Sequence, residues 1–274
     1  MSANTKADAL ADQGVTQSER SQLDNNQDDR SRVAGGNAIP AIIQRELSSL
    51  FYSPIAYVVG FVFLLLTGYF FVTETLVMGG EASLRTLFER MAGVLVFALP
   101  MLTMRSVADE FATNTIETLL TAPVKDIHVI LGKFTGTLLF YIILLATTLL
   151  HLFLMERYAD PISSVIVVGY LGMVLLGALF VSIGIFASCC TRHQLLAAII
   201  AIFTLAVFTF VADYGAEYAA QAWQRQVCAY LNILGHFSDF SKGIIDTRSL
   251  IFFLTGTGFF LFLAVKVLES RRWR

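Results

Sequence analysis

The chain has 274 residues, of which 56% are hydrophobic and 15% charged, with 19 basic and 21 acidic side chains. Soluble globular domains carry about a quarter charged residues, so this composition excludes an ordinary soluble domain. The near balance of charges gives no indication of nucleic-acid binding. Three cysteines, Cys189, Cys190 and Cys228, form no CxxC pair. We interpret them as packed thiols, with metal binding assisted by His193 as the weaker alternative.

Residues 1–38 contain no Phe, Trp or Tyr and include a polar run from Ser18 to Arg32. Such a segment buries too little apolar surface to offset the entropy lost on ordering, so it is predicted to be disordered. It holds no apolar stretch long enough for a signal peptide. We therefore expect a retained cytoplasmic tail, with the membrane domain over 39–274.

A short amphipathic helix is predicted just ahead of the first apolar run. Its apolar positions recur at helical spacing and are Ile39, Ile42, Ile43, Leu47, Leu50 and Phe51. This pattern is typical of a helix that lies in the membrane interface. Ser53 and Pro54 end it, because proline lacks an N–H donor and restrains the residue before it. We expect an elbow that turns the chain into the bilayer.

Six apolar runs are each long enough to cross a bilayer, which takes about 20 helical residues. They cover approximately residues 54–76, 87–104, 127–155, 162–190, 195–211 and 250–268. The second is the least clearly defined, because its uncharged run is short and contains Pro100. The predicted fold class is an all-α integral membrane protein with six transmembrane helices.

The positive residues set the expected orientation. With an even number of crossings and both termini inside, the outside basic residues are Arg85, Arg90, Arg157, Arg225, Lys242 and Arg248, which leaves the other 13 of the 19 inside. Cytoplasmic loops carry the excess of Lys and Arg. Both termini are therefore predicted to be cytoplasmic, in a multi-pass membrane protein.

No charged residue falls at the centre of any predicted span. Lys133 and Lys266 lie within about two helical turns of the cytoplasmic surface, where we expect their side chains to snorkel. This argues against an ion-coupled carrier or a voltage sensor. The pair Gly132-Lys133 lacks the other residues of a phosphate-binding loop, and the sequence has no HExxH or GxSxG motif. The chain is thus not expected to hydrolyse ATP or to hold a cofactor or metal.

Small residues punctuate two of the spans. Gly132 and Gly136 form a GxxxG pair, and the fourth span carries Gly172, Gly177, Ser182, Gly184 and Ser188. Such residues allow helices to approach closely. Packing within the chain explains them at least as well as a dimer seam.

The connection over residues 105–124 carries the clearest functional signal. Asn114 and Glu117 have the spacing of a helix cap and its reciprocal partner, and Pro123 ends that short helix. Leu119 and Leu120 lie on its apolar stripe with Ile116, and Asp109, Glu110 and Glu117 lie toward its N-terminal side. This mixture favours a peg that docks into another protein, although a helix resting on lipid has the same features.

This connection resembles the coupling region of ABC-2 type permeases, on the residues Thr115-Ile116-Glu117-Thr118-Leu119-Leu120 and Ala122-Pro123-Val124. The stretch from Leu234 to Arg248 resembles the gliding-motility and nitrous-oxide-accessory branch, and Phe51-Tyr52-Ser53-Pro54 adds a third match. The matches span residues 40–274. The sequence departs from the family at Asn114, where Gly often precedes the Thr.

The resemblance implies a half-transporter that pairs with a second permease copy or a related permease. Each permease would receive a separate ATP-binding subunit, which holds ATP and Mg, on the loop between spans 2 and 3. The residues implied in that contact are Asp109, Glu110, Asn114, Glu117, Leu119, Leu120 and Pro123.

Between Asp213 and Ser249, the resemblance implies short helices that dip into the outer leaflet. They would form a lid, a platform for an extracytoplasmic accessory protein, or an anchor in membrane lipid. The residues assigned to this role are Trp223, His236, Phe237, Phe240, Asp246 and Arg248. Two alternatives to an exporter remain: a membrane subunit that transmits ATPase work to an extracytoplasmic partner, and a non-transporting scaffold.

Overall fold

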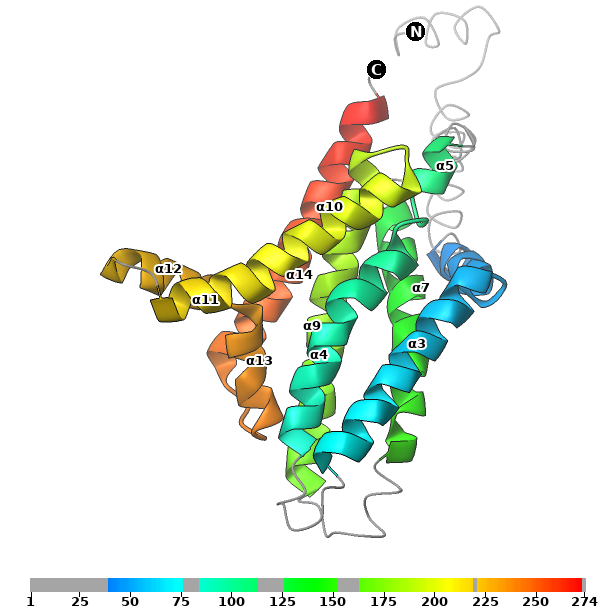
Figure 1. Ribbon diagram of the computed structural model, residues 1–274. Helices are drawn as coiled ribbons and strands as arrows, with labels where there is room; N and C mark the ends of the chain where they lie inside the picture. Colours follow the sequence, from blue (N-terminus) through cyan, green and yellow to red (C-terminus); the bar gives the residue numbers. More distant parts are fainter. Residues whose placement is uncertain (1–38, 76–83, 113–125, 152–162, 219–220, 273–274) are drawn as a thin grey trace, which may run out of the picture.

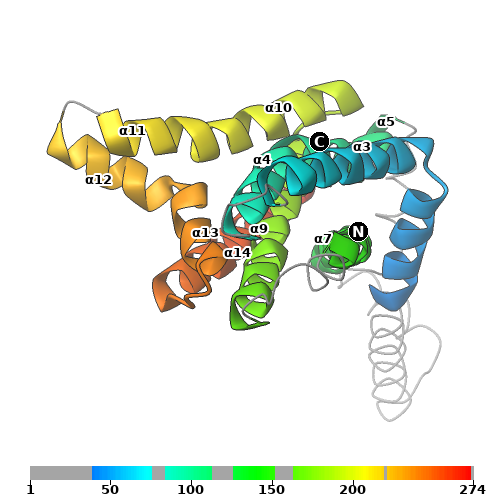
Figure 2. The ribbon, with the colours of Figure 1, turned by 60° about the horizontal axis from the view of Figure 1, so that its bottom comes forward.

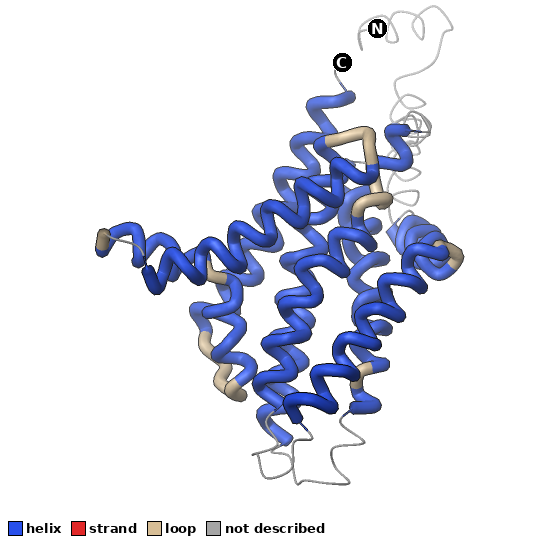
Figure 3. Tube along the Cα trace, in the orientation of Figure 1, coloured by secondary structure: helices blue, strands red, loops and turns tan. Residues whose placement is uncertain are grey.

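The computed structural model describes residues 39–75, 84–112, 126–151, 163–218 and 221–272. Within these ranges every regular element is a helix (Figures 1 and 3). In chain order they are helix 39–51, α3 (Pro54–Phe70), η1 (Phe71–Thr75), α4 (Leu84–Thr103), α5 (Ala108–Ala112), α7 (Asp126–Thr147), α9 (Ser163–Cys190), α10 (Gln194–Ala206), η2 (Val207–Val211), α11 (Ala212–Tyr218), α12 (Ala222–Leu231), α13 (Ile233–Ser241) and α14 (Thr247–Arg272). The disordered tail predicted over 1–38 lies outside the described residues.

Six helices in the described residues are long and apolar enough to cross a membrane. They are Pro54–Thr73, Arg85–Ala112, Asp126–His151, Val165–Cys190, Gln194–Tyr218 and Thr247–Ser270. The predicted all-α fold with six such helices is confirmed. The fifth runs seven residues beyond its predicted end at Val211, because η2 and α11 continue α10 without a break. Pro100 is accommodated inside α4.

The α9 helix is the centre of the bundle, in contact with α4, α7, α10, α13 and α14. Its small residues make these contacts close. A Cβ added at Gly172 would lie 2.5 Å from Cβ of Phe240, and one added at Gly184 would lie 2.0 Å from Oγ1 of Thr103. Only a residue without a side chain lets α13 and α4 approach so closely. The small residues of the fourth span therefore serve packing within the chain.

Helix 39–51 packs across α7 at the GxxxG pair. A Cβ added at Gly132 would lie 2.6 Å from Cγ2 of Ile42, and one added at Gly136 would lie 2.9 Å from Cβ of Glu46. The chain then turns at Ser53, which has an extended conformation, and Pro54 occupies the first turn of α3. Figure 2 shows helix 39–51, in blue, and α3 running in different directions. The predicted break at Ser53 and Pro54 is present, whereas the position of this helix in a membrane interface stays a prediction.

A hairpin of α11 and α12 projects from the bundle on the left of Figure 1. These two helices contact each other more than either contacts any other element, although α11 also continues directly from η2. Exposed aromatic side chains cover the hairpin, namely Tyr214, Tyr218, Trp223 and Tyr230. The α13 helix returns the chain to the bundle, where Phe237 and Phe240 are fully buried.

The orientation predicted from the basic residues can be tested with single cysteines in a background lacking the three native ones. A cysteine in place of Arg30 and one added after Trp273 should be shielded from an impermeant thiol reagent in intact cells. A cysteine in place of Gln221, which is exposed at the start of the α12 region, should react. Labelling at either terminus would contradict the six-span topology.

Candidate functional site

The residues that flank the predicted coupling segment converge at one end of the bundle. Segment 113–125 itself lies outside the described residues, and with it Asn114, Glu117, Leu119, Leu120 and Pro123. Its two neighbours in the chain, α5 and the start of α7, are described. We call the cluster that surrounds them the polar junction, and it consists of Glu46, Arg105, Ser106, Asp109, Glu110, Lys133 and Ser188.

A single hydroxyl group from α9 fixes the start of α5. Ser188 Oγ accepts hydrogen bonds from the backbone N–H groups of Val107 at 3.1 Å and Ala108 at 2.9 Å, and it donates to the carbonyl of Met104 at 3.1 Å. The N–H groups at a helix start have no partner within their own helix. Ser188 therefore satisfies them from another span and joins the end of α4 to α5.

Replacing Ser188 by Ala should lower the free energy of unfolding by about 1–3 kcal/mol, because two buried N–H groups would lose their partner. Ser182→Ala is the matched control: this serine is equally buried, but its hydroxyl donates only to the carbonyl of Leu179 in its own helix. Thermal unfolding of the purified protein in detergent measures both. Equal stability of the two variants would show that Ser188 does not hold α5.

Lys133 lies at the centre of the polar junction. Its Nζ atom is 3.3 Å from Glu46 Oε2 on helix 39–51 and 3.0 Å from Glu110 Oε1 on α5, and it donates to the carbonyl of Ser106. The Lys133 side chain is only 4% exposed. Ser106 Oγ in turn donates to Glu46 Oε1 at 2.7 Å. The expectation that Lys133 snorkels to the surface is wrong, since two carboxylates from other elements hold the ammonium group inside the protein.

Asp109 makes two further contacts that hold α5 in place. Asp109 accepts a hydrogen bond from Arg105 Nε at 3.0 Å and another from Gln194 Nε2 at the start of α10. Arg105 also donates to Ser53 Oγ at 3.2 Å, at the turn between helix 39–51 and α3. Asp109 and Glu110, which the family resemblance implies in an ATPase contact, thus pair with side chains of this chain.

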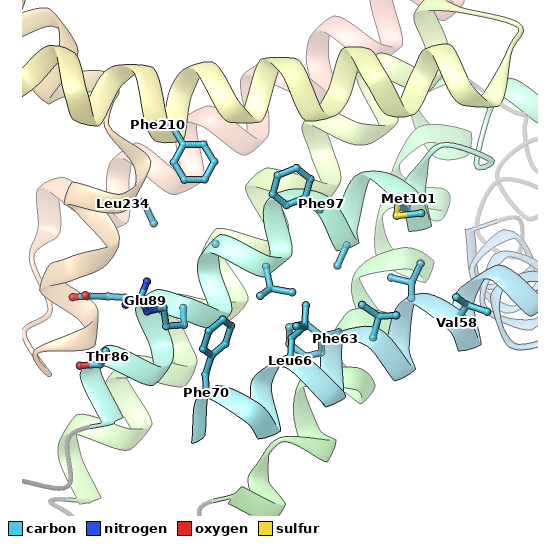
Figure 4. Close-up of a pocket in the computed structure, with 16 residues that line it drawn as sticks. Val58, Phe63, Leu66, Phe70, Thr86, Glu89, Phe97, Met101, Phe210 and Leu234 are labelled. Atoms are coloured by element: carbon cyan, nitrogen blue, oxygen red, sulfur yellow. The ribbon is translucent and has the colours of Figure 1, made fainter. Parts of the chain in front are cut away.

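A second feature is a groove between α3 and α4 with a volume of about 850 Å³ (Figure 4). Its walls are almost wholly apolar, with Val58, Phe63, Leu66, Phe97 and Met101 among them. Thr86, Glu89 and Arg90 lie toward one end, and Phe210 of η2 and Leu234 of α13 complete the lining. Ligand sites have this size and this combination of apolar walls with few polar groups.

The residues that the sequence analysis assigned to an extracytoplasmic contact differ in their exposure: some are buried and others lie on the surface. Phe237 and Phe240 are buried core residues and offer no surface to a partner. His236 stacks on Phe252 with ring centroids 4.4 Å apart, and its Nδ1 lies 3.1 Å from Ser249 Oγ.

The other three residues of that assignment lie nearer the surface. Asp246 Oδ1 accepts from the N–H of Arg248 at 2.9 Å, at the start of α14. Trp223, 61% exposed, and Arg248 are on the surface. No group of three or more His, Cys, Asp or Glu that could hold a metal occurs in the described parts of the chain.

The sequence reasoning missed five residues of the polar junction, namely Glu46, Arg105, Ser106, Lys133 as an inward-facing group, and Ser188 as a cap. A signal for two of them was present, because a lysine directly after a helix-packing glycine and a glutamate on the amphipathic helix could have been paired. Nothing in the sequence relates Ser188 to Val107.

Comparison with known families identifies the chain. Residues 16–229 match the family described as ABC-2 family transporter protein. No curated protein matches the sequence. The match covers most of the chain. It includes every residue of the polar junction, and both α3 and α4, which form the walls of the groove. The chain therefore belongs to the ABC-2 family of transporter proteins and is a multi-pass membrane permease subunit of an ABC transporter.

Proposed function

We propose that this permease is the membrane-spanning half of an ATP-driven exporter in a bacterial cytoplasmic membrane. A separate ATP-binding subunit, which holds ATP and Mg, docks on segment 113–125. Both termini and the polar junction face the cytoplasm. Family membership supports an ATP-binding partner, and the resemblance of Leu234–Arg248 supports the gliding-motility and nitrous-oxide-accessory branch.

The observation that carries this proposal is the way α5 is held. Ser188 of α9 caps α5 at Ala108, five residues before segment 113–125 begins. Within α5, Glu110 pairs with Lys133 of α7, and Asp109 accepts a hydrogen bond from Gln194 of α10. A peg that receives force from an ATPase needs a rigid base, because a loose one would absorb the movement. Contacts from three spans supply that base.

The groove between α3 and α4 is the proposed half of an export path. Exposed apolar side chains continue beyond it along α3 and α10, among them Tyr57, Phe61, Leu195, Ile199 and Phe203. A second permease copy facing this surface would convert two grooves into one enclosed passage. Because the charged side chains in the groove lie near one end only, the passage suits a substrate with an apolar portion.

The projecting hairpin favours a second function, in which the permease transmits ATPase work to an extracytoplasmic partner. Tyr218, Trp223 and Tyr230 are each at least 61% exposed there. Tyrosine and tryptophan at such positions serve both membrane interfaces and protein contacts. An extracytoplasmic accessory protein would therefore bind at α11 and α12, while a lipid anchor would use the same residues.

The proposal is tested by purifying the tagged permease from the membranes of its own host and identifying the chains that co-elute. We expect an ATP-binding subunit with a phosphate-binding loop, a second permease chain, and ATP hydrolysis by the complex. An extracytoplasmic protein in the same complex would favour the second function. A folded permease that elutes without any ATP-binding chain would contradict both.

A further inference from the structure

We infer that helix 39–51 is a working part of the coupling apparatus, and that Lys133 is the positioning residue that makes it follow segment 113–125. Movement of the segment would reach α5, pass through Lys133 to helix 39–51, and from there reach α3, which forms one wall of the groove. This inference rests on the proposed function, since it needs a docked ATP-binding subunit to start the movement.

The first argument is electrostatic. Lys133 Nζ bridges two carboxylates from two different elements that both precede it in the chain, Glu46 of helix 39–51 and Glu110 of α5. All three side chains are at most 13% exposed. If Glu110 moved away with α5, the cluster would lose a buried charge pair, which is strongly unfavourable. We therefore expect helix 39–51 and α5 to move together.

An exposed pair in the same chain shows the contrast. Lys266 Nζ lies 2.7 Å from Glu269 Oε2, but the two side chains are 54% and 42% exposed. Water replaces the partner of such a charge at little cost. The ion pair at Lys266 is shorter than either ion pair at Lys133. Nevertheless, of these residues only the buried Lys133 is expected to transmit a displacement.

The second argument is packing. Gly132 and Gly136 bring helix 39–51 into direct backbone contact with α7, with Lys133 between them in the sequence. Ser106, the last link before α5, is hydrogen-bonded to Glu46 at 2.7 Å as well. Helix 39–51 is thus attached to the residues that precede segment 113–125, at Ser106 and Glu110, and to α7, which follows it.

The third argument is the route to the groove. Helix 39–51 ends at Phe51, and only Tyr52 and Ser53 separate it from α3. Arg105 Nη1 donates to Ser53 Oγ at 3.2 Å, so the turn itself is tied to the residues that precede α5. With so short a connection, we expect a rotation of helix 39–51 to shift the start of α3. The α3 helix supplies Val58, Val62 and Leu66 to the groove wall.

The test is hydrogen–deuterium exchange on the complete complex with its ATP-binding subunit, with and without ATP. Peptides covering 41–51 and 104–112 report on helix 39–51 and α5. In the wild type, ATP should change exchange in both by about fivefold or more, the lower end of typical coupling between sites. In Lys133→Met, the change at α5 should remain while the change at 41–51 is lost. The control Lys266→Met should behave as the wild type.

Glu46→Gln guards against misfolding of Lys133→Met. It keeps the side-chain shape and leaves Lys133 paired with Glu110, but removes the buried charge of helix 39–51 that faces Lys133. The remaining ion pair of this helix, between Arg45 and Glu110 at 3.9 Å, involves an exposed arginine and is therefore weak. Glu46→Gln should also lose the ATP response at 41–51, with the ATP-binding subunit still bound. An ATP response at 41–51 that survives in Glu46→Gln, or is missing in the wild type while α5 responds, would overturn the inference alone. Absence of an ATP-binding subunit from the wild-type complex would instead overturn the proposed function, and the inference with it.

Discussion

Replacement of Gly177 by Ala is expected to lower the free energy of unfolding by about 1–3 kcal/mol. An added Cβ would lie 2.1 Å from Cε1 of Tyr141, which is fully buried between α7 and α9. The ring cannot withdraw easily, because its hydroxyl donates to the carbonyl of Met173 at 2.9 Å. Thermal unfolding of the purified permease in detergent measures the loss.

Gly258→Ala is the matched control for this variant. A Cβ at Gly258 meets no atom within 4 Å, and alanine is the better helix former by up to about 1 kcal/mol. This control should be as stable as the wild type or slightly more so. Combining Gly177→Ala with Tyr141→Leu should cost less than the two single changes added together, since the smaller side chain makes room for the Cβ. Equal melting temperatures for Gly177→Ala and Gly258→Ala would show that α7 and α9 do not pack as described.

The six spanning helices could be predicted because the requirement is local. A bilayer needs about 20 consecutive apolar residues, and each run carries that information within itself. The break at Ser53 and Pro54 was predictable for the same reason, since proline acts on its immediate neighbours. Segment ends were less accurate, as at Val211, where nothing in the apolar pattern shows that η2 and α11 prolong the helix.

The sequence holds a signal for two residues of the polar junction, but the geometry of the junction does not follow from it, because the contacts join residues far apart in the chain. Lys133 and Glu46 are 87 residues apart, and Ser188 and Val107 are 81 apart. On a single helix Lys133 looks like a lysine near a membrane surface. Only the packing of helix 39–51 over Gly132 and Gly136 places Glu46 beside it and turns its side chain inward. Tertiary structure, not helical periodicity, decides the environment of this charge.

The coupling assignment predicts that changing Leu119 and Leu120 together to Ser will release the ATP-binding subunit. An apolar anchor at the centre of an interface contributes about 2 kcal/mol or more, which is roughly a thirtyfold loss of affinity. Glu117→Lys should act in the same direction. It reverses a charge near the N-terminus of the predicted helix, where a carboxylate is favoured by about 0.3–1 kcal/mol, and removes the capping partner of Asn114.

The measurement is the amount of ATP-binding subunit recovered per mole of correctly folded permease, with folding verified by gel filtration before the comparison. Leu149 and Leu150 are another adjacent leucine pair, exposed just beyond the end of α7 that lies far from Lys133. Changing both to Ser repeats the same loss of apolar surface away from the junction and should leave recovery unchanged. If Leu119 and Leu120 anchor the peg, their variant should lose the ATP-binding subunit or uncouple its hydrolysis, because the predicted apolar stripe then keeps only Ile116. Wild-type recovery and coupled hydrolysis in both the leucine variant and Glu117→Lys would refute docking at segment 113–125, and the ATP-binding subunit would have to contact another part of the same end of the bundle.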